Sequence, residues 1–368
     1  MTDNIPKTMH AVVLTGHGGF DKLKFHRDWP VPVPESGEVL IRVAACGLNN
    51  TDVNTRSAWY SKGNNDATTG DALVGAEGED GTWGGASVSF PRIQGADAVG
   101  TVIRVGDGVT HSLIGRRVII DGWLRDWNDP LNREKAGYFG SECDGGYAQY
   151  TKVSHQQVHP VDTTMSDAEL ATFACSYVTA ENMLNRAAVT DEDTVLITGA
   201  SGGVGSALIQ LANRRGAKCV ALCGAGKADA VKAVGPLAVI DRASANLGSA
   251  LHDAIGKDSV DVVADVVGGV LWPQLINALT RGGRYTCAGA IGGPIVEFDL
   301  RTFYLRDLTF TGATVPPPGV FQDLIGYIER DEIQPLLAAT YPLEELHTAQ
   351  QAFIDKRHVG NIVVKPFV

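Results

Sequence analysis

The sequence predicts an α/β fold in which a doubly wound parallel sheet follows a β-rich region. Two observations predict the parallel sheet. From residue 194 onward, short apolar runs alternate with helix-like segments, and a glycine-rich turn joins the first run to its helix. A third observation predicts the β-rich region, because strand patterns and proline turns without a helical period fill the chain before residue 160. At 368 residues, the chain is long enough for two domains.

The β-rich region is expected to contain short strands separated by glycine and proline turns. The predicted strands cover 9–14, 39–45, 93–106, 117–121 and 145–153. Two long segments, 61–90 and 122–144, interrupt this pattern. Long loops inside a compact domain are usually functional, so we expect both to line a cleft.

The second half is expected to alternate helix and strand. Helices are predicted over 167–187, 227–234, 271–281 and near 320–330, and strands over 194–199, 218–222, 237–241, 260–265, 283–289 and 308–313. The tail adds one more helix and a final strand. That strand could return to the β-rich region.

A glycine-rich turn follows the first strand of the parallel sheet. The stretch TVLITGASGGVG runs from Thr194 to Gly205 and leads into a segment with apolar residues at helical spacing. The glycines permit a tight turn and a close approach to a pyrophosphate, which the N–H groups at the helix N-terminus can bind. A purely structural turn is the alternative. The strand before the turn and the helix after it favour a dinucleotide site.

Composition narrows the functional class. The formal net charge of −11 argues against binding to nucleic acid or to an anionic membrane surface. No signal-peptide pattern and no apolar run long enough to span a bilayer is present. The six cysteines form no Cys-x-x-Cys pair, which favours a reduced, cytoplasmic protein.

The order of these regions resembles the medium-chain dehydrogenase/reductase superfamily. Three patterns carry the resemblance: CGLNNTD, GADAVGTVIRVG and GASGGVGSALIQLA. The stretch NNTDVNTRS further resembles the zinc-independent quinone oxidoreductase and enoyl reductase branch. The resemblance implies a GroES-like catalytic domain of residues 1–160 and 320–368, a Rossmann domain of residues 161–319, and a homodimer paired along the edge strand at 307–313.

The zinc-dependent members of this superfamily differ at the metal ligands. They have a zinc-binding Cys where this chain has Asn49, and Gly-His-Glu where it has Gly95-Ala96-Asp97. Only one of the usual catalytic ligands has a counterpart in this chain, Cys175, and we expect this residue to be a packing residue. Because a catalytic zinc needs three protein ligands, no metal is expected; a zinc assembled around His155 or His159 is the alternative.

Without zinc, the resemblance implies hydride transfer from a nicotinamide to a conjugated C=C bond or a quinone. The resulting enolate needs hydrogen-bond donors and a proton. Tyr60 resembles a tyrosine regarded as the proton donor, although it could instead be an aromatic lid. Asn49 is expected to orient nicotinamide or substrate. Asp52 and Arg56 are expected to pair with each other and brace the segment.

NADPH is the expected cofactor. NAD-selective sites usually end the second strand with an acidic residue, and this strand ends in Cys223-Gly224 instead. Lys227 and Arg242 follow the second and third strands, and by resemblance they contact the 2′-phosphate. An ordinary solvated lysine is the alternative for Lys227.

The remaining cofactor contacts rest on the turn and on the resemblance. The full set is Thr179, Gly199, Ser201, Gly202, Gly203, Val204, Gly205, Lys227, Arg242, Val266, Val267, Gly289, Ala290, Ile291 and Asn361. The expected function is NADPH-dependent reduction of a small electrophilic substrate. An alcohol dehydrogenase or carbonyl reductase of the same superfamily, or a non-catalytic NADPH-binding protein, is the alternative.

Overall fold

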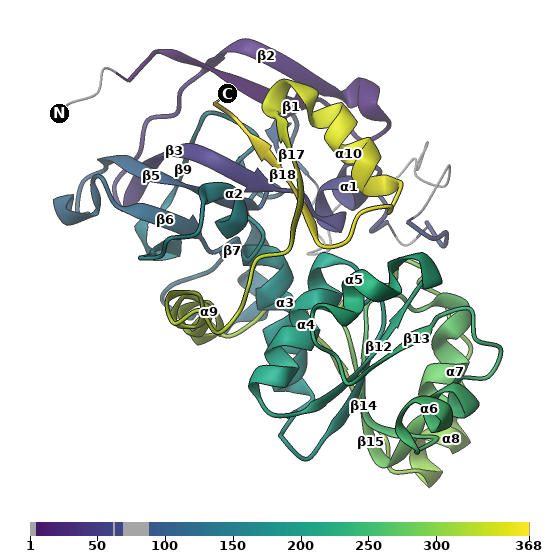
Figure 1. Ribbon diagram of the computed structural model, residues 1–368. Helices are drawn as coiled ribbons and strands as arrows, with labels where there is room; N and C mark the ends of the chain where they lie inside the picture. The colour runs from purple at the N-terminus through teal and green to yellow at the C-terminus, as the bar shows by residue number, and fades with distance from the viewer. Residues whose placement is uncertain (1–4, 62, 69–87, 368) are drawn as a thin grey trace.

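The computed structural model describes residues 5–61, 63–68 and 88–367. In Figure 1, a β-rich part lies above a parallel sheet, and the C-terminal strands and α10 join the β-rich part. None of the helices in the described ranges is long and apolar enough to cross a membrane.

The parallel sheet is doubly wound, in agreement with the sequence. Its strands are β11 (Thr194–Ile197), β12 (Lys218–Cys223), β13 (Ala238–Asp241), β14 (Val260–Asp265), β15 (Leu279–Cys287) and β16 (Thr309–Gly312). All neighbours are parallel, in the order β13-β12-β11-β14-β15-β16. This is the order of a dinucleotide-binding sheet, with its switch point between β11 and β14.

Helices cover both faces of this sheet. They are α3 (Ala174–Arg186), α4 (Gly203–Arg214), α5 (Ala228–Lys232), α6 (Leu247–Ile255), α7 (Trp272–Asn277), α8 (Leu300–Leu305) and α9 (Gly319–Glu329). Val195 and Ile197 of β11 belong to the hydrophobic core beneath α3, α4 and α9. Leu196, between them, belongs to the core beneath α6 and α7. Because side chains alternate along a strand, β11 is apolar on both faces.

The β-rich part contains β1 (Thr8–Leu14), β2 (Leu23–Pro30), β3 (Glu38–Gly47), β4 (Arg92–Ile93), β5 (Asp97–Val105), β6 (Arg117–Ile120), β7 (Trp123–Leu124), β8 (Gly137–Tyr138), β9 (Tyr150–Ser154), β10 (Val158–Pro160), β17 (Leu337–Pro342) and β18 (Asn361–Lys365), with α1 (Asn50–Arg56), α2 (Asp167–Leu170) and α10 (Leu346–Ile354). Its largest sheet has the order β10-β6-β5-β3-β18-β17, and β9 also pairs with β3. The final strand does return here, because Val363 of β18 pairs antiparallel with Gly47 of β3.

Several expectations for the β-rich part were wrong: β10 was not predicted, and the strand expected over 93–106 is interrupted at 94–96. β2 and β17 were not expected, because both are sheet edges with few buried residues and end in proline, which an edge tolerates. Residues 145–149 are not a strand. Gly145 approaches another turn so closely that a Cβ there would lie 2.5 Å from the carbonyl oxygen of Gly95. The predicted loop 122–144 contains the short strands β7 and β8.

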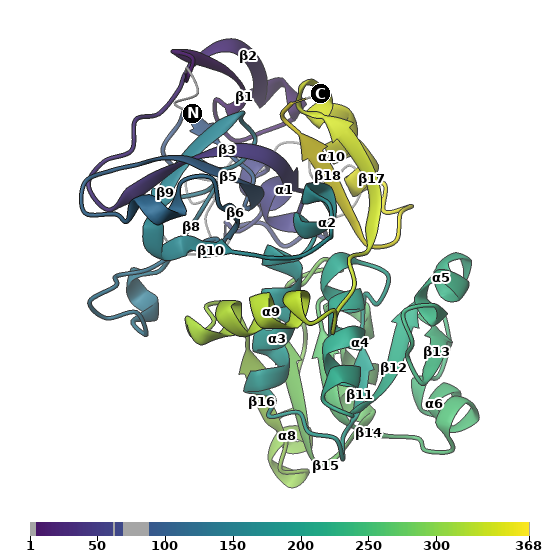
Figure 2. The same ribbon diagram turned by 60° about the vertical axis from the view of Figure 1, so that its left-hand side comes forward.

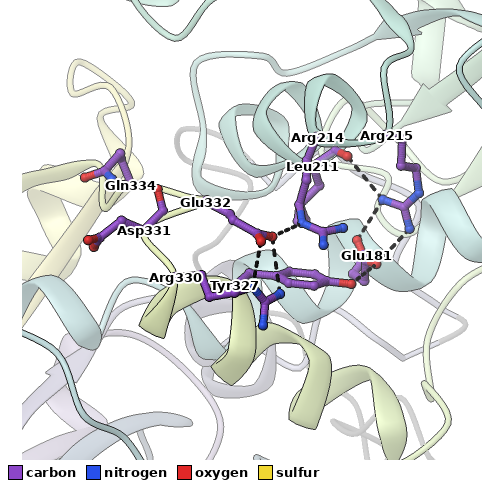
Figure 3. A network of polar contacts seen from close by, with 9 residues as sticks. All are labelled: Glu181, Leu211, Arg214, Arg215, Tyr327, Arg330, Asp331, Glu332 and Gln334. Atoms are coloured by element: carbon purple, nitrogen blue, oxygen red, sulfur yellow. Dashed lines mark hydrogen bonds and ion pairs between the residues drawn. The ribbon is translucent and has the colours of Figure 1, made fainter.

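A polar network fixes α9 to the helices of the parallel sheet (Figure 3). Arg215, after α4, donates two hydrogen bonds of 2.8 Å to the carboxylate of Glu181 on α3. The hydroxyl of Tyr327 on α9 donates to the same carboxylate at 3.3 Å. Figure 2 shows α9 lying across α3. The domain limits at residues 160/161 and 319/320 stay a prediction.

We propose that the open edge of β16 pairs with a second copy of the chain. β16 ends the sheet order, and α8 directly before it exposes Leu300, Tyr304 and Leu305. Light scattering at micromolar concentration is expected to give a dimer mass, and Leu305→Asp is expected to give a monomer. Leu131→Asp, which changes an exposed leucine on the β-rich part, serves as the control. A monomer mass for the unchanged protein would contradict the proposal.

Candidate active site

A cleft of about 1510 Å³ lies between the β-rich part and the carboxyl ends of the parallel strands. Residues that follow β11, β12, β14 and β15 line one side, and residues of α1 and the segment after α10 line the other. Pockets for drug-sized ligands are usually about 300–1,000 Å³. The cleft therefore has room for a dinucleotide and a small second molecule.

The glycine turn at the end of β11 lies at the floor of this cleft. Gly199 adopts a left-handed conformation, with φ of 59°. A Cβ on Gly205 would lie 2.2 Å from the carbonyl oxygen of Gly199, so the helix packs on the turn at a distance that only glycine allows. Gly202 is the N-cap of α4, a helix of 12 residues. Its free N–H groups can bind a phosphate group.

A buried carboxylate, which the sequence analysis missed, holds the strand ends in place. Asp265 at the end of β14 accepts hydrogen bonds from the Thr198 hydroxyl at 2.5 Å and the Tyr285 hydroxyl at 2.7 Å. The backbone N–H groups of Val267 and Gly268 also donate to it. Asp265 thereby shapes the floor of the cleft without lining it.

The cofactor residues predicted from sequence gather in this one cleft, with a single exception. Those that line it are Thr179, Gly199, Ser201, Gly202, Gly203, Val204, Gly205, Lys227, Arg242, Val266, Val267, Gly289, Ala290 and Ile291. Asn361 instead lies behind the turn, where its side chain donates to the Ser176 hydroxyl at 3.0 Å. Their roles toward a cofactor stay predictions.

Lys227 and Arg242 lie at the end of the cleft where β12 and β13 finish. The Lys227 ammonium donates to the carbonyl oxygens of Lys356 at 2.6 Å and His358 at 2.8 Å. An ammonium has three N–H donors, so one remains for a ligand. Arg242 is exposed, and its guanidinium lies beside Gly224. Within the described ranges, no carboxylate pairs with either cation, so this end of the cleft suits an anionic group.

The opposite end of the cleft carries hydroxyl, amide and thiol groups. Asn49, Tyr60, Trp123, Tyr138 and Cys175 line it. Tyr60 is half-buried and hydrogen-bonded to the side chains of Thr51 and Asn54, and burial raises the pKa of its phenol. The phenol therefore stays protonated at neutral pH and can donate a proton. Loop 122–144 contributes Trp123 and Tyr138, as expected, whereas most of loop 61–90 lies outside the described residues.

Two buried carboxyl groups lie beneath Asn49. Asp52 accepts from the backbone N–H of Asn49 at 2.8 Å and from that of Gly95 at 3.2 Å. Asp97 accepts from the backbone N–H of Cys175 at 2.8 Å, and the Asn49 amide contacts its carboxyl. Burial raises the pKa of Asp52 to about 6 and that of Asp97 to about 7. These groups position α1 and Asn49.

The predicted pairing of Asp52 with Arg56 is wrong. Arg56 instead donates to the Gln350 side chain at 3.1 Å and to the carbonyl of Gly18 at 2.7 Å. The Asp52 carboxyl instead accepts a hydrogen bond from the backbone N–H of Asn49, because a carboxylate at this position caps the start of α1. Arg56 thus connects α1 to α10.

The residues at this end of the cleft do not fit a catalytic zinc. Of the ligand positions, Asn49 carries an amide and Ala96 a methyl group, so neither supplies a typical zinc ligand. Only the Cys175 thiol and the Asp97 carboxyl remain, and the Asn49 amide already contacts that carboxyl. Burial raises the pKa of the Cys175 thiol, which opposes the thiolate that a zinc ligand requires. The described part of the chain contains no group of three His, Cys, Asp or Glu residues arranged for a metal. His155 and His159 do not line the cleft.

The segment after α10 also lines the cleft, whereas the sequence analysis placed only Asn361 of this stretch near a cofactor. Lys356, Arg357 and His358 belong to the cleft wall. The only signal was the run KRHVG before the last strand, which a solvated turn would equally explain.

Comparisons with known proteins agree with this architecture. Residues 35–163 match the family model "Alcohol dehydrogenase GroES-like domain", and residues 203–330 match "Zinc-binding dehydrogenase". The chain is 28% identical to the acryloyl-coenzyme A reductase of Metallosphaera sedula, over 97% of this chain and 99% of that protein. It is 26% identical to the quinone oxidoreductase of Rattus norvegicus, over 95% of this chain and 94% of that protein. The solved structure of a putative alcohol dehydrogenase from Sinorhizobium meliloti is 45% identical in sequence. The match covers 99% of this chain and 98% of that chain, with a TM-score of 0.91.

Proposed function

This chain is an oxidoreductase of the medium-chain dehydrogenase/reductase superfamily, and we propose that it transfers hydride from NADPH to a conjugated C=C bond or a quinone without a catalytic zinc. Members of the superfamily use nicotinamide cofactors. The coenzyme would supply the hydride, and this chain's own residues would hold the two reactants and stabilise the developing negative charge.

One observation carries the proposal. The substrate end of the cleft presents the Tyr60 phenol and the Asn49 amide, whereas the positions of the superfamily's zinc ligands hold Asn49 and Ala96. A saturated ketone or an alcohol needs strong polarisation of its oxygen, which a metal usually provides. A conjugated carbonyl or a quinone accepts hydride more easily and forms a stabilised oxyanion, for which neutral hydrogen-bond donors suffice.

The positions of the residues suggest a division of roles. The glycine turn at Ser201–Gly202 and the start of α4 would hold the diphosphate. Thr179, beside Cys175 on α3, would face the nicotinamide, because both line the cleft near Asn49. Tyr60 would donate the proton or stabilise the enolate, and Asn49 would orient the carbonyl oxygen.

The preference for NADPH rests on charge. β12 ends at Cys223 without the acidic residue that binds a free ribose hydroxyl. Lys227 and Arg242 lie at this end of the cleft and could receive a 2′-phosphate, to which cations bind strongly.

The proposal is tested with three electron acceptors. We expect NADPH to reduce an α,β-unsaturated ketone or enoyl thioester and a quinone, but to reduce a matched saturated ketone at least about 10²-fold more slowly, since no Lewis acid assists. Elemental analysis should find less than stoichiometric zinc, and a chelator should leave the rates unchanged. Preferential reduction of the saturated ketone, with one zinc per chain, would refute the proposal.

A second candidate is an alcohol dehydrogenase or carbonyl reductase. The 45% identical structure described as a putative alcohol dehydrogenase favours it. The same experiment separates the two, because this enzyme would oxidise an alcohol or reduce the saturated ketone. A non-catalytic NADPH-binding protein would bind the cofactor and turn over none of the three acceptors.

A further inference from the structure

The segment that connects α10 to β18 lies across the cleft and touches the parallel sheet at two places. The backbone N–H of Gly360 donates to the carbonyl of Ser201 in the glycine turn at 2.9 Å. Lys227, at the start of α5, donates to the carbonyls of Lys356 and His358. This segment, residues 355–360, is therefore fixed between the glycine turn and the end of β12.

Lys356 extends from this segment into the cleft. Its ammonium donates to the side-chain oxygen of Asn50, at the start of α1, at 2.9 Å. It also lies 3.7 Å from the centre of the Phe353 ring. The Lys356 side chain thus reaches from this segment, whose backbone Lys227 contacts, to the start of α1 on the same wall of the cleft.

No carboxylate in the described residues forms an ion pair with Lys356. Lys227 is the charged group that acts on the Lys356 ammonium, and the neighbouring Asp355 accepts from Gln351 at 2.8 Å instead. His358 is held neutral at pH 7, because burial and the two lysines lower its pKa to about 4. Its Nδ1 atom is buried without a hydrogen-bond partner.

Such an arrangement costs free energy in the absence of an anion. Burial and the charge of Lys227 lower the pKa of Lys356 to about 7. Partial desolvation, a nearby second cation and the lack of a counter-ion all disfavour the charged ammonium relative to the neutral amine. A bound anion reverses this and favours the ammonium. Several cations without an ion pair in the described residues, Lys227, Arg242 and Lys356, line this cleft, although the chain as a whole carries a net charge of −11.

We propose that the Lys356 ammonium binds the diphosphate of the dinucleotide, opposite the N-terminus of α4. The inference rests on the proposed function only in requiring a dinucleotide in the cleft. Because NADPH and NADH share the diphosphate, Lys356 contributes equally to both. This separates its role from that of Lys227 and Arg242 at the 2′-phosphate.

The direction in which coenzyme affinity changes with pH follows from the charge of the Lys356 ammonium. Because burial and Lys227 lower the pKa of Lys356 to about 7, part of this residue is deprotonated near pH 7 in the free protein, whereas a bound anion favours the protonated form. We therefore expect binding to be accompanied by proton uptake near pH 7 and by almost none at about pH 5.5. The affinity for both coenzymes falls as the pH rises through 7, toward a limit of about tenfold per pH unit.

The experiment measures dissociation constants from pH 6 to 8.5 for Lys356→Met, Lys356→Arg and the unchanged protein. At pH 6, Lys356→Met is expected to weaken NADPH, NADH and ADP-ribose by the same factor, about tenfold or more. In Lys356→Met, the affinity for the coenzymes should no longer fall as the pH rises above 7. Lys356→Arg should bind tightly up to pH 8.5, because arginine does not titrate there. Lys365→Met, which removes one exposed charge from β18, serves as the control.

Adenosine 2′-monophosphate, which lacks a diphosphate, separates this role from a structural one. Lys356→Met should leave its affinity unchanged, and equal weakening of this probe and of ADP-ribose would overturn the inference. Unchanged NADPH and NADH binding in Lys356→Met would also overturn it, while leaving the proposed function intact. Failure of the unchanged protein to bind either coenzyme would refute the proposed function itself.

Discussion

Replacing Tyr60 with phenylalanine is expected to lower kcat for a conjugated enone by about 10²-fold or more, as the loss of a general acid does. The phenol lines the substrate end of the cleft with Asn49 and is hydrogen-bonded to Thr51 and Asn54. Burial raises its pKa, so the proton is present throughout the neutral range. The phenyl ring of the variant keeps the packing against Trp59, whose ring centre is 5.6 Å away. NADPH binding should therefore hardly change.

Quinone reduction should suffer less in the Tyr60→Phe variant, because the oxyanion of a reduced quinone is more stable and needs less help. Steady-state rates with an enone and a quinone provide this comparison. Tyr341→Phe, a half-buried tyrosine of β17 that does not line the cleft, is the matched control. Near-normal kcat with both substrates would make Tyr60 an aromatic lid and would favour solvent as the source of the proton.

The parallel sheet could be predicted because its strands are apolar on both faces. Val195, Leu196 and Ile197 are fully buried, so β11 appears in the sequence as a continuous apolar run between turn residues. The edge strand β17 lacks this signal, since its exposed and half-buried residues alternate without a clear apolar face. Hydrophobic patterns reveal the centre of a sheet more readily than its borders.

The site could be predicted where chemistry depends on backbone shape. The glycine turn is visible because Gly199 and Gly205 occupy positions that exclude any side chain. Lys356 was not predicted as a ligand, because its place in the cleft depends on contacts with Asn50 and Lys227, both distant in sequence. Asp52 and Arg56 show the converse error. Their spacing suggested an ion pair, but the cap of α1 and the contact with α10 determine their partners.

Replacing Arg242 with alanine is expected to weaken NADPH binding about ten- to a hundredfold and to leave NADH binding nearly unchanged. A lost charge-assisted contact to a phosphate costs about 1.5–3 kcal/mol, which corresponds to that range. Arg242 is exposed directly after β13, and no ion pair of the described residues involves it, so its removal should not disturb the fold. Lys218→Ala, which removes a cation from the opposite end of β12, is the control.

Lys227→Ala should show a mixed effect that reflects its two roles. NADPH should again be weakened about ten- to a hundredfold, because the third N–H of the ammonium can reach the 2′-phosphate. NADH should also be weakened, by a smaller factor, because the carbonyls of Lys356 and His358 lose their donor and the segment that carries Lys356 is released. Dissociation constants for both coenzymes in the two variants distinguish the roles. Equal weakening of NADPH and NADH in Arg242→Ala would remove Arg242 from the 2′-phosphate site, and equal weakening in Lys227→Ala would reduce Lys227 to a structural contact between the sheet and the segment 355–360.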